Sequence, residues 1–185
     1  MNMREFICID VPSLPGLADI YADRLFRDRC IKDSGKGGLH FTLHFLGEIE
    51  ETHNPGLFRL IDAVASRHHK FRVAYRGTGA FPSLHRPSVI WAGVSDSRDL
   101  ELIHQQLGEG LVDLGIPVER RRFAPHVTLA RARCRPDTAV LNDFFHAWED
   151  RHIGQHEVLS ICLKESVLSQ TGAIHRTIHE SQLCG

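Results

Sequence analysis

A four-residue pattern, His-x-Thr-Leu, occurs twice in this chain of 185 residues. The first copy begins at His40 and the second copy begins at His126, 86 residues later. With the His, Thr and Leu content of this sequence, chance would supply roughly 0.05 copies, so composition does not explain a duplicate. A third His-x-Thr begins at His175, but its fourth residue and its flanks differ.

The spacing within each copy suits a β-strand, because successive side chains of a strand point to opposite faces of the sheet. His40 and Thr42 then share one face, and His126 and Thr128 share one face of the second strand. If the two strands pair about a pseudo-two-fold axis, two imidazoles and two hydroxyls line a single cleft. We expect a phosphate-sized site there, backed by an apolar core.

Two imidazoles in one site can perform general acid and base catalysis. Their ordinary pKa of about 6.5 allows one ring to accept a proton while the other donates one near neutral pH. Each participating group typically contributes about 10² to 10⁴ in rate. Threonine hydroxyls add hydrogen bonds to the non-bridging oxygens of a phosphate. The spacing does not decide which histidine is the acid and which is the base.

Periodicity predicts an α+β chain whose second half resembles its first. No linker or low-complexity segment divides it, so we expect one domain over residues 1–185, built of two similar lobes. Alternating or β-rich runs predict strands at residues 5–11, 39–46, 71–75, 88–94, 126–132 and 157–163. Apolar residues at helical spacing predict helices at residues 14–30, 57–64, 100–114 and 136–148, and residues 77–82 are rich in turn formers.

At the duplicated motif the chain resembles the 2H phosphoesterases, and within them the RNA 2′,3′-cyclic phosphodiesterases, also called LigT-like proteins or 2′-5′ RNA ligases. The resemblance implies two similar lobes, each an antiparallel sheet with helices packed on it, related by pseudo-two-fold symmetry around a central cleft. The blocks that carry it stand in the family's order and cover most of the chain: residues 40–48, 79–82, 86–94, 123–133 and 165–168.

The resemblance also implies roles for the motif residues. His40 would donate a proton to the leaving 3′ oxygen, and His126 would accept a proton from the attacking water. Thr42 and Thr128 would bind the phosphate. The implied reaction converts a 2′,3′-cyclic phosphate at an RNA end, or a nucleoside cyclic phosphate, to a 2′-phosphate without a metal or other cofactor. The reverse reaction would form a 2′-5′ linkage.

Two segments depart from the family's pattern. Residues 34–38, Ser-Gly-Lys-Gly-Gly, precede the first motif, at a place where relatives carry a more apolar segment that contains proline. His175 stands where relatives often carry tyrosine, which puts in doubt a substrate contact from that strand.

Three further residues are candidates for contact with the substrate: His44, Arg131 and Arg133. Strand alternation predicts that His44 shares a face with His40 and could tune it or line the outer cleft. Arg131 and Arg133 belong to a set of six arginines, suited to phosphate, at positions 120, 121, 122, 131, 133 and 135. Alternation puts both opposite the motif histidines unless the strand bulges or ends.

The aromatic residues near the motifs admit two interpretations. Phe45, Phe81 and Trp91 could stack on a base, as aromatic side chains do in many sites for single-stranded RNA. Each of them lies in an apolar stretch, however. The sequence therefore favours a place in the core.

Composition narrows the class of protein. A net charge of −1 argues against bulk electrostatic binding of long nucleic acids. Five cysteines are scattered singly, without a Cys-x-x-Cys pair, so we predict neither a disulfide framework nor a thiolate zinc site, and we expect a reducing, cytoplasmic location. The sequence contains no uncharged apolar stretch of about 18 residues, so it indicates neither a signal peptide nor a membrane span. We expect a monomer that does not associate with membranes.

Two alternative functions stay open. The first is a protein that binds RNA ends or nucleotides without turnover, against which the presence of both motif histidines argues. The second is a metal-dependent hydrolase that uses some of the other histidines among the 13. The pairs His152/His156 and His175/His179 have four-residue spacing, but neither adjoins a carboxylate set that would complete a metal site.

Overall fold

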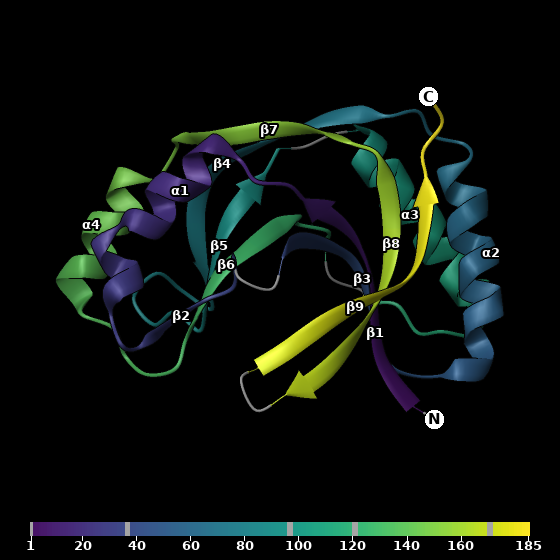
Figure 1. The fold of residues 1–185 in the computed structure, drawn as a ribbon, viewed down its shortest axis with the longest axis horizontal. Coiled ribbons are helices and arrows are strands. Elements are labelled where there is room, and N and C mark those ends of the chain that lie inside the picture. The colour runs from purple at the N-terminus through teal and green to yellow at the C-terminus, as the bar shows by residue number, and fades with distance from the viewer. Residues whose placement is uncertain (1, 36–37, 96–97, 120–121, 170–171) are drawn as a thin grey trace.

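The computed structural model describes residues 2–35, 38–95, 98–119, 122–169 and 172–185, and it shows one curled antiparallel sheet with four α-helices (Figure 1). Eight strands form a continuous path, and the short strand β2 pairs with β6 off this path. In path order the strands are β7 (His152–Val158), β4 (Phe71–Phe81), β5 (Val89–Val94), β6 (His126–Ala132), β3 (Leu39–Glu50), β1 (Asn2–Val11), β8 (Ser160–Ser169) and β9 (Gly172–Gln182), with β2 at Ile31–Asp33.

The helices gather at the two ends of the molecule and mark two lobes (Figure 1). Lobe A contains β2, β4, β5, β6 and β7 with α1 (Pro15–Ala22) and α4 (Thr138–Ala147). Lobe B contains β1, β3, β8 and β9 with α2 (Asn54–Ala65) and α3 (Arg98–Asp113). The expected α+β class and two-lobed arrangement are confirmed.

The two lobes do not correspond to the two halves of the chain. Strand β1 pairs with β3 on one side and with the late strand β8 on the other. In the same way, β4 of the first half pairs with β5 and with β7 of the second. Each lobe therefore combines segments from both halves, because backbone pairing across the halves fixes which strands are neighbours.

Most predicted elements are present, and three segments differ clearly from the prediction. The segment expected as a turn at residues 77–82 lies largely within β4, where Gly77 has a φ of +67° and accommodates an irregularity in the register. The helical pattern at residues 14–30 is divided into α1 and a 3-10 turn at Arg24–Arg27. The strand predicted at 157–163 spans the junction of β7 and β8.

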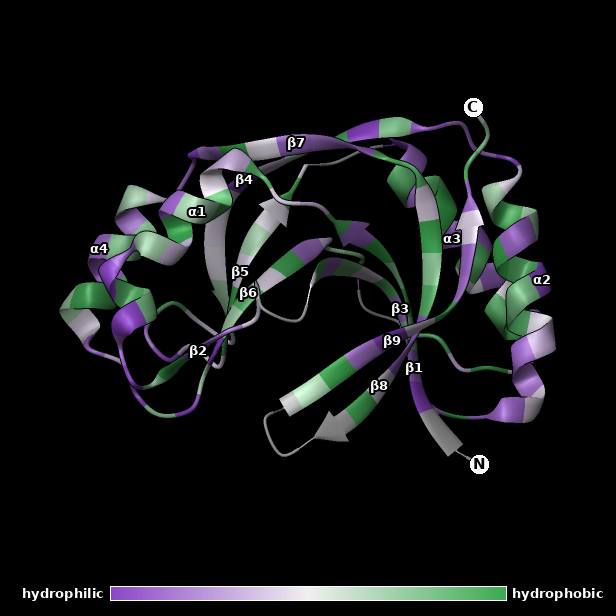
Figure 2. Cartoon of the chain, in the orientation of Figure 1, coloured by the Kyte–Doolittle hydropathy of each residue, from purple (hydrophilic) through white to green (hydrophobic). Residues whose placement is uncertain are grey.

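The two faces of the sheet differ in composition. The helix-covered face carries the main core, in which Phe41, Val127 and Ile9 are almost completely buried. The other face of β1 and β8 carries a small separate cluster of Phe6, Cys8 and Cys162. Hydrophobic and hydrophilic residues accordingly alternate along the strands (Figure 2).

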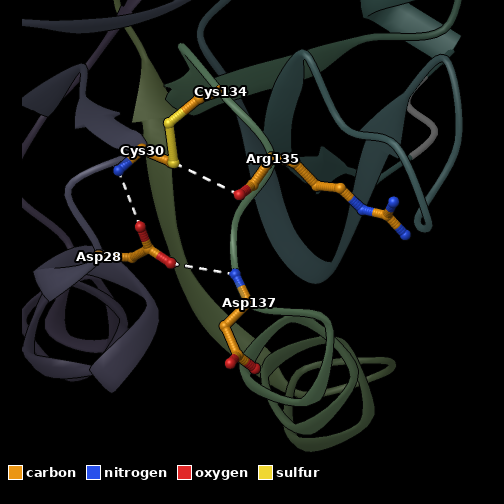
Figure 3. Close-up of a disulfide and its surroundings, with 5 residues drawn as sticks. All are labelled: Asp28, Cys30, Cys134, Arg135 and Asp137. Carbon is orange, nitrogen blue, oxygen red and sulfur yellow. Dashed lines mark hydrogen bonds between the residues drawn. A yellow bond between two sulfur atoms is a disulfide. The ribbon is translucent and has the colours of Figure 1, made fainter.

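The prediction that no disulfide is present is wrong, because Cys30 and Cys134 are bonded across 104 positions of sequence (Figure 3). Strands β2 and β6 pair with Ile31 opposite Ala132, which brings the two cysteines beside each other. The argument for a reducing location from scattered cysteines therefore fails. Cys8, Cys162 and Cys184 are free thiols. In the described residues, no helix is both long and apolar enough to cross a membrane.

Candidate active site

The two motif strands are neighbours in the sheet. Phe41, the second residue of the first motif, pairs with Val127, the second residue of the second motif. Extending this antiparallel register by one residue each way sets His40 opposite Thr128 and Thr42 opposite His126. Because Phe41 and Val127 are buried in the main core, alternation turns these four side chains to the other face. The two motif strands therefore pair, which is the condition under which the sequence predicts a shared site.

Both motifs contain a β-bulge at their leucine. In β3, Thr42 pairs with Cys8 of β1 and His44 pairs with Ile7, so Leu43 is an extra residue. In β6, Thr128 pairs with Trp91 and Ala130 pairs with Ile90, so Leu129 is an extra residue. Each bulge shifts the alternation of side chains by one position.

The bulges change which later side chains share the site face. Three residues after Thr128, Arg131 lies on the face of His126 and is exposed, so the alternation that set Arg131 opposite the site does not hold. Phe45 occupies the equivalent position after Thr42 and is 59% exposed. The β2–β6 ladder continues to a hydrogen bond from the Arg133 N–H to the Cys30 carbonyl, which puts Arg133 on the same face as Arg131.

The predicted place of His44 is wrong for the same reason. The bulge at Leu43 turns His44 to the helix-covered face, where it is buried. Its Nε2 lies 2.8 Å from the His104 carbonyl of α3, and the two rings stack at 4.2 Å. His104 stacks in turn on Phe123. His44 therefore holds α3 against β3 and does not lie beside His40.

His40 lies in an aromatic and largely buried environment. Its ring stacks on Phe6 with centroids 4.9 Å apart, and the ring of His175 meets it edge-on at 5.1 Å. The Nδ1 atom of His175 is buried and has no hydrogen-bond partner within the described part of the chain. The departure from the family's pattern at His175 therefore lies in direct contact with the first motif histidine.

Burial, followed by the nearby charges of His175 and Lys164, lowers the pKa of His40 from its ordinary value to about 4. Asp10 and a hydrogen bond to the Gly38 backbone act in the opposite direction without offsetting these effects. Burial, followed by Lys164 and Arg131, also lowers the pKa of His175. In the free protein at neutral pH, His40 is therefore uncharged.

Lys164 and Asp10 form an ion pair beside His40. The Lys164 Nζ lies 2.6 Å from Asp10 Oδ1 and 2.8 Å from Oδ2, and the lysine side chain is only 12% exposed. Asp10 pairs with His40 across β1 and β3. Burial acts to lower the pKa of Lys164, but its hydrogen bond to Asp10 and nearby acidic groups raise it overall. A fixed positive charge is thus held near the first motif, which no pattern in the sequence indicated.

His126 lies in a more open environment. Its Nδ1 lies 2.9 Å from the Ala124 carbonyl, so Nδ1–H donates to that oxygen and Nε2 stays free to accept a proton. Its ring faces Phe81 at 5.0 Å and Trp91 at 6.1 Å. Gly79 allows Trp91 to lie across β4, because a Cβ at that position would be 2.2 Å from the indole ring.

The expectation that the three aromatic residues belong to the core is wrong, because none of them is part of the main core or packed against it. Phe45 is 59% exposed and Phe81 is 41% exposed, whereas Trp91 is half-buried. Strand alternation and the bulge at Leu43 place Phe45 on the open face. One exposed aromatic ring therefore lies near each motif histidine: Phe45 contacts Phe6, and Phe81 contacts His126.

Several sequence features remain to be placed. Within the described residues, no group of three or more His, Cys, Asp or Glu side chains could hold a metal ion. Arg122 is exposed. Of the arginine set, Arg120 and Arg121 lie outside the described residues, as do residues 36 and 37 of the glycine-rich approach to the first motif.

Comparison with known proteins places the chain in a family. Residues 18–161 match the model of the 2′-5′ RNA ligase superfamily, so the chain belongs to that superfamily. It is 37% identical over 143 residues to an RNA 2′,3′-cyclic phosphodiesterase of Aeropyrum pernix, a match that covers 76% of this chain and 80% of that protein. It is 30% identical over 178 residues to an RNA 2′,3′-cyclic phosphodiesterase of Methanocaldococcus jannaschii, covering 96% and 99% of the two chains.

Solved structures agree with this assignment. The TT0787 protein of Thermus thermophilus superposes with a TM-score of 0.82 over 99% of each chain at 27% identity. The LigT protein of E. coli complexed with 3′-AMP superposes with a TM-score of 0.73 over the full length of both chains at 21% identity, which supports the fold. The resemblance to LigT-like 2H phosphoesterases is confirmed.

Proposed function

We propose that this protein hydrolyses RNA 2′,3′-cyclic phosphate ends to 2′-phosphate ends by metal-independent acid–base catalysis with His40 and His126. The pairing of Phe41 with Val127 is the observation that carries the proposal, because it brings the duplicated motifs together on one face of the sheet. Relatives that share this family are named RNA 2′,3′-cyclic phosphodiesterases. Their name supports the choice of substrate.

In the proposed mechanism the cyclic phosphate binds between the motifs, with its non-bridging oxygens on Thr42 and Thr128. His126 takes a proton from water through Nε2, and the water oxygen forms a bond to phosphorus. The bond between phosphorus and the 3′ oxygen breaks, and His40 gives a proton to that oxygen. The products are a 3′-hydroxyl and a 2′-phosphate. His126 is left protonated and His40 neutral, and proton exchange with solvent resets the pair.

Because the pKa of His40 is low in the free protein, His40 must take a proton from solvent when the substrate binds and raises that pKa. An anion close to an imidazole favours the charged form of the ring and raises its pKa. We therefore expect His40 to be neutral in the free enzyme and protonated in the complex. The cation of Lys164 opposes this protonation, and the phosphate charge reverses its effect.

The test is incubation of the pure protein, with EDTA present, with a short RNA that ends in a 2′,3′-cyclic phosphate. Chromatography against 2′- and 3′-phosphate standards identifies the product. A 2′-phosphate end supports the proposal and fixes which oxygen leaves. Product only after metal is added would favour a metal-dependent hydrolase, and no product in either condition would favour an RNA-end binding protein.

A monomeric state and a cytoplasmic location complete the proposal. Sedimentation of the pure protein measures the first. The second is a proposal from the proposed RNA substrate alone, because the disulfide removes the argument from cysteine spacing. Fractionation of the native cells measures it.

A further inference from the structure

A basic pocket lies beyond the end of β6 that carries Arg131. Its volume is about 280 Å³, and three of its lining residues are arginines: Arg86, Arg133 and Arg135. Pro87, Ala132, Cys134 and Pro136 complete the lining. Arg86 comes from the β4–β5 connection and the other two come from the segment that follows β6. Residues far apart in sequence therefore supply three positive charges to one small concavity.

The backbone that carries these arginines is held in place from several sides. The Arg133 N–H donates to the Cys30 carbonyl at 2.7 Å, and the adjacent Cys134 is bonded to Cys30. The Ala132 N–H donates to the Ser88 carbonyl at 3.0 Å, which ties this segment to the loop that bears Arg86. The Asp137 N–H donates to Asp28, whose second carboxylate oxygen accepts from the Cys30 N–H (Figure 3). A binding site arranged in advance needs little ordering when a ligand arrives.

The three guanidinium groups are available to a ligand. All three residues are exposed, and none forms an ion pair with a carboxylate among the residues that the structure describes. The side chain of Arg135 extends away from Asp28 and Asp137 (Figure 3). Like charges held together without a counter-charge favour binding of an anion, and arginine is suited to the planar, two-pronged contacts that phosphate accepts.

The pocket is connected to the active site along β6. From Thr128 to Arg133 is five residues of strand, or about 16 Å, which a few nucleotides of single-stranded RNA can span. Arg131 lies between them on the site face, and its positive charge contributes to the lowered pKa of His175. A row of cations thus runs from the motif histidines to the pocket.

We infer that this pocket binds a backbone phosphate of the RNA several nucleotides upstream of the cyclic end. The inference rests on the proposed function, because the cyclic end must occupy the motif site. It names the substrate class: an oligonucleotide end, recognised by its phosphates without regard to base, is preferred over a nucleoside cyclic phosphate. Binding at the pocket adds affinity for the chain and does not enter the chemical step.

The test compares two substrates and three proteins. The substrates are adenosine 2′,3′-cyclic phosphate and a five-nucleotide RNA with a cyclic end. The proteins are the wild type, the double variant Arg86→Gln/Arg135→Gln, and the matched control Arg59→Gln/Arg67→Gln, whose exposed arginines lie on and just after α2 in lobe B. Both variants lose the same charge and keep both motifs.

We expect kcat/KM on the pentanucleotide to fall about ten-fold or more in the pocket variant, with the mononucleotide reaction unchanged. The slope of log(kcat/KM) against log(salt) should become shallower by about 0.7 for each phosphate that the variant no longer binds. The control variant should match the wild type on both substrates. An unchanged preference for the pentanucleotide in the pocket variant, or an equal loss on both substrates, would overturn the inference.

A binding measurement separates this inference from the proposed function. If neither substrate is turned over, the proposed function has failed, and the pocket is tested with a fluorescent pentanucleotide that carries a 2′-phosphate. Anisotropy should then give weaker binding to the pocket variant than to the wild type or the control. Equal affinity for all three proteins would contradict the pocket's role directly.

Discussion

The two halves of the site have the same sequence motif and the same backbone geometry, yet their surroundings differ. Each motif has a bulge at its leucine. The ring of each histidine also forms a hydrogen bond with the backbone two residues earlier: His40 with Gly38, and His126 with Ala124. His40, however, is packed between Phe6 and His175, whereas His126 borders the exposed ring of Phe81.

The charges near the two motifs differ as well. After the first bulge the equivalent position holds Phe45, and after the second it holds Arg131. An ion pair of Lys164 and Asp10 adjoins only the first motif histidine. Duplicated residues thus supply two imidazoles of the same type, and the buried, charged surroundings of the first lower the pKa of His40. Acid and base roles can be separated by environment while the motif stays the same.

The strongest test of this comparison removes each histidine in turn. His40→Ala and His126→Ala should each reduce kcat on a cyclic phosphate end by about 10² to 10⁴, because each removes a proton-transfer group. His146→Ala, on the exposed surface of α4, is the control and should keep full activity. Circular dichroism should show all three variants folded. Full activity in either motif variant would refute the two-histidine mechanism.

The lobes differ in their cross-links, and this difference predicts an effect on stability. The disulfide joins Cys30, the residue before β2, to Cys134 in the segment after β6 within lobe A, and it closes a long loop. Cys134→Ser should lower the free energy of unfolding by about 2 to 4 kcal/mol in non-reducing urea titrations. Reductant should lower the stability of the wild type by a similar amount and leave the variant unchanged. A wild type that is insensitive to reductant would contradict the cross-link.

The equivalent positions after the bulges should contribute unequally. Arg131→Ala should lower kcat/KM about ten-fold or more, because a hydrogen bond to a charged group is worth roughly 1.5 to 3 kcal/mol. Phe45→Ala should have a smaller effect on the same substrate, since it removes no charge. Steady-state kinetics of both variants measure the difference. Equal losses would show that the two positions act alike.

The smallest effect concerns the proton affinity of His40. Lys164→Met removes a cation and should raise the pKa of His40 towards the ordinary value, as measured by NMR titration of the ring protons. Lys70→Met, on the exposed surface after α2, should leave it unchanged. A His40 pKa that stays the same in Lys164→Met would exclude the electrostatic effect.

The same pKa predicts how stability depends on pH. The folded-state pKa of His40, about 4, lies below the unfolded value of about 6.5, so the unfolded chain binds more protons between these two pH values. His40 therefore favours folding above this window, and its contribution is lost as the pH falls through it. In Lys164→Met, the free energy of unfolding should fall less as the pH is lowered through this window, which urea titrations at several pH values would detect.

Much of the fold could be predicted from local pattern. The strand at His126–Ala132 and the helix at Arg98–Asp113 both follow from the periodicity of their apolar residues. The end of that helix follows from Gly115, whose φ of +75° is one that glycine tolerates. The division of the lobes could not be predicted, because hydrogen bonds between distant strands decide which segments are neighbours. The disulfide also depends on such a pairing, between β2 and β6, and the spacing of the cysteines contained no sign of it.

The sequence by itself predicted the groups of the proposed site: two histidines and two threonines, with one histidine and one threonine on the same face of each strand. The tertiary structure decided which other side chains join them. Two bulges moved His44 out of the site and brought Arg131 into it, since one extra residue reverses the side-chain alternation that follows. Folding also brought His175 and Lys164 to His40 from late strands. Proton affinity depends on burial and on charges in space, which spacing along a chain does not specify.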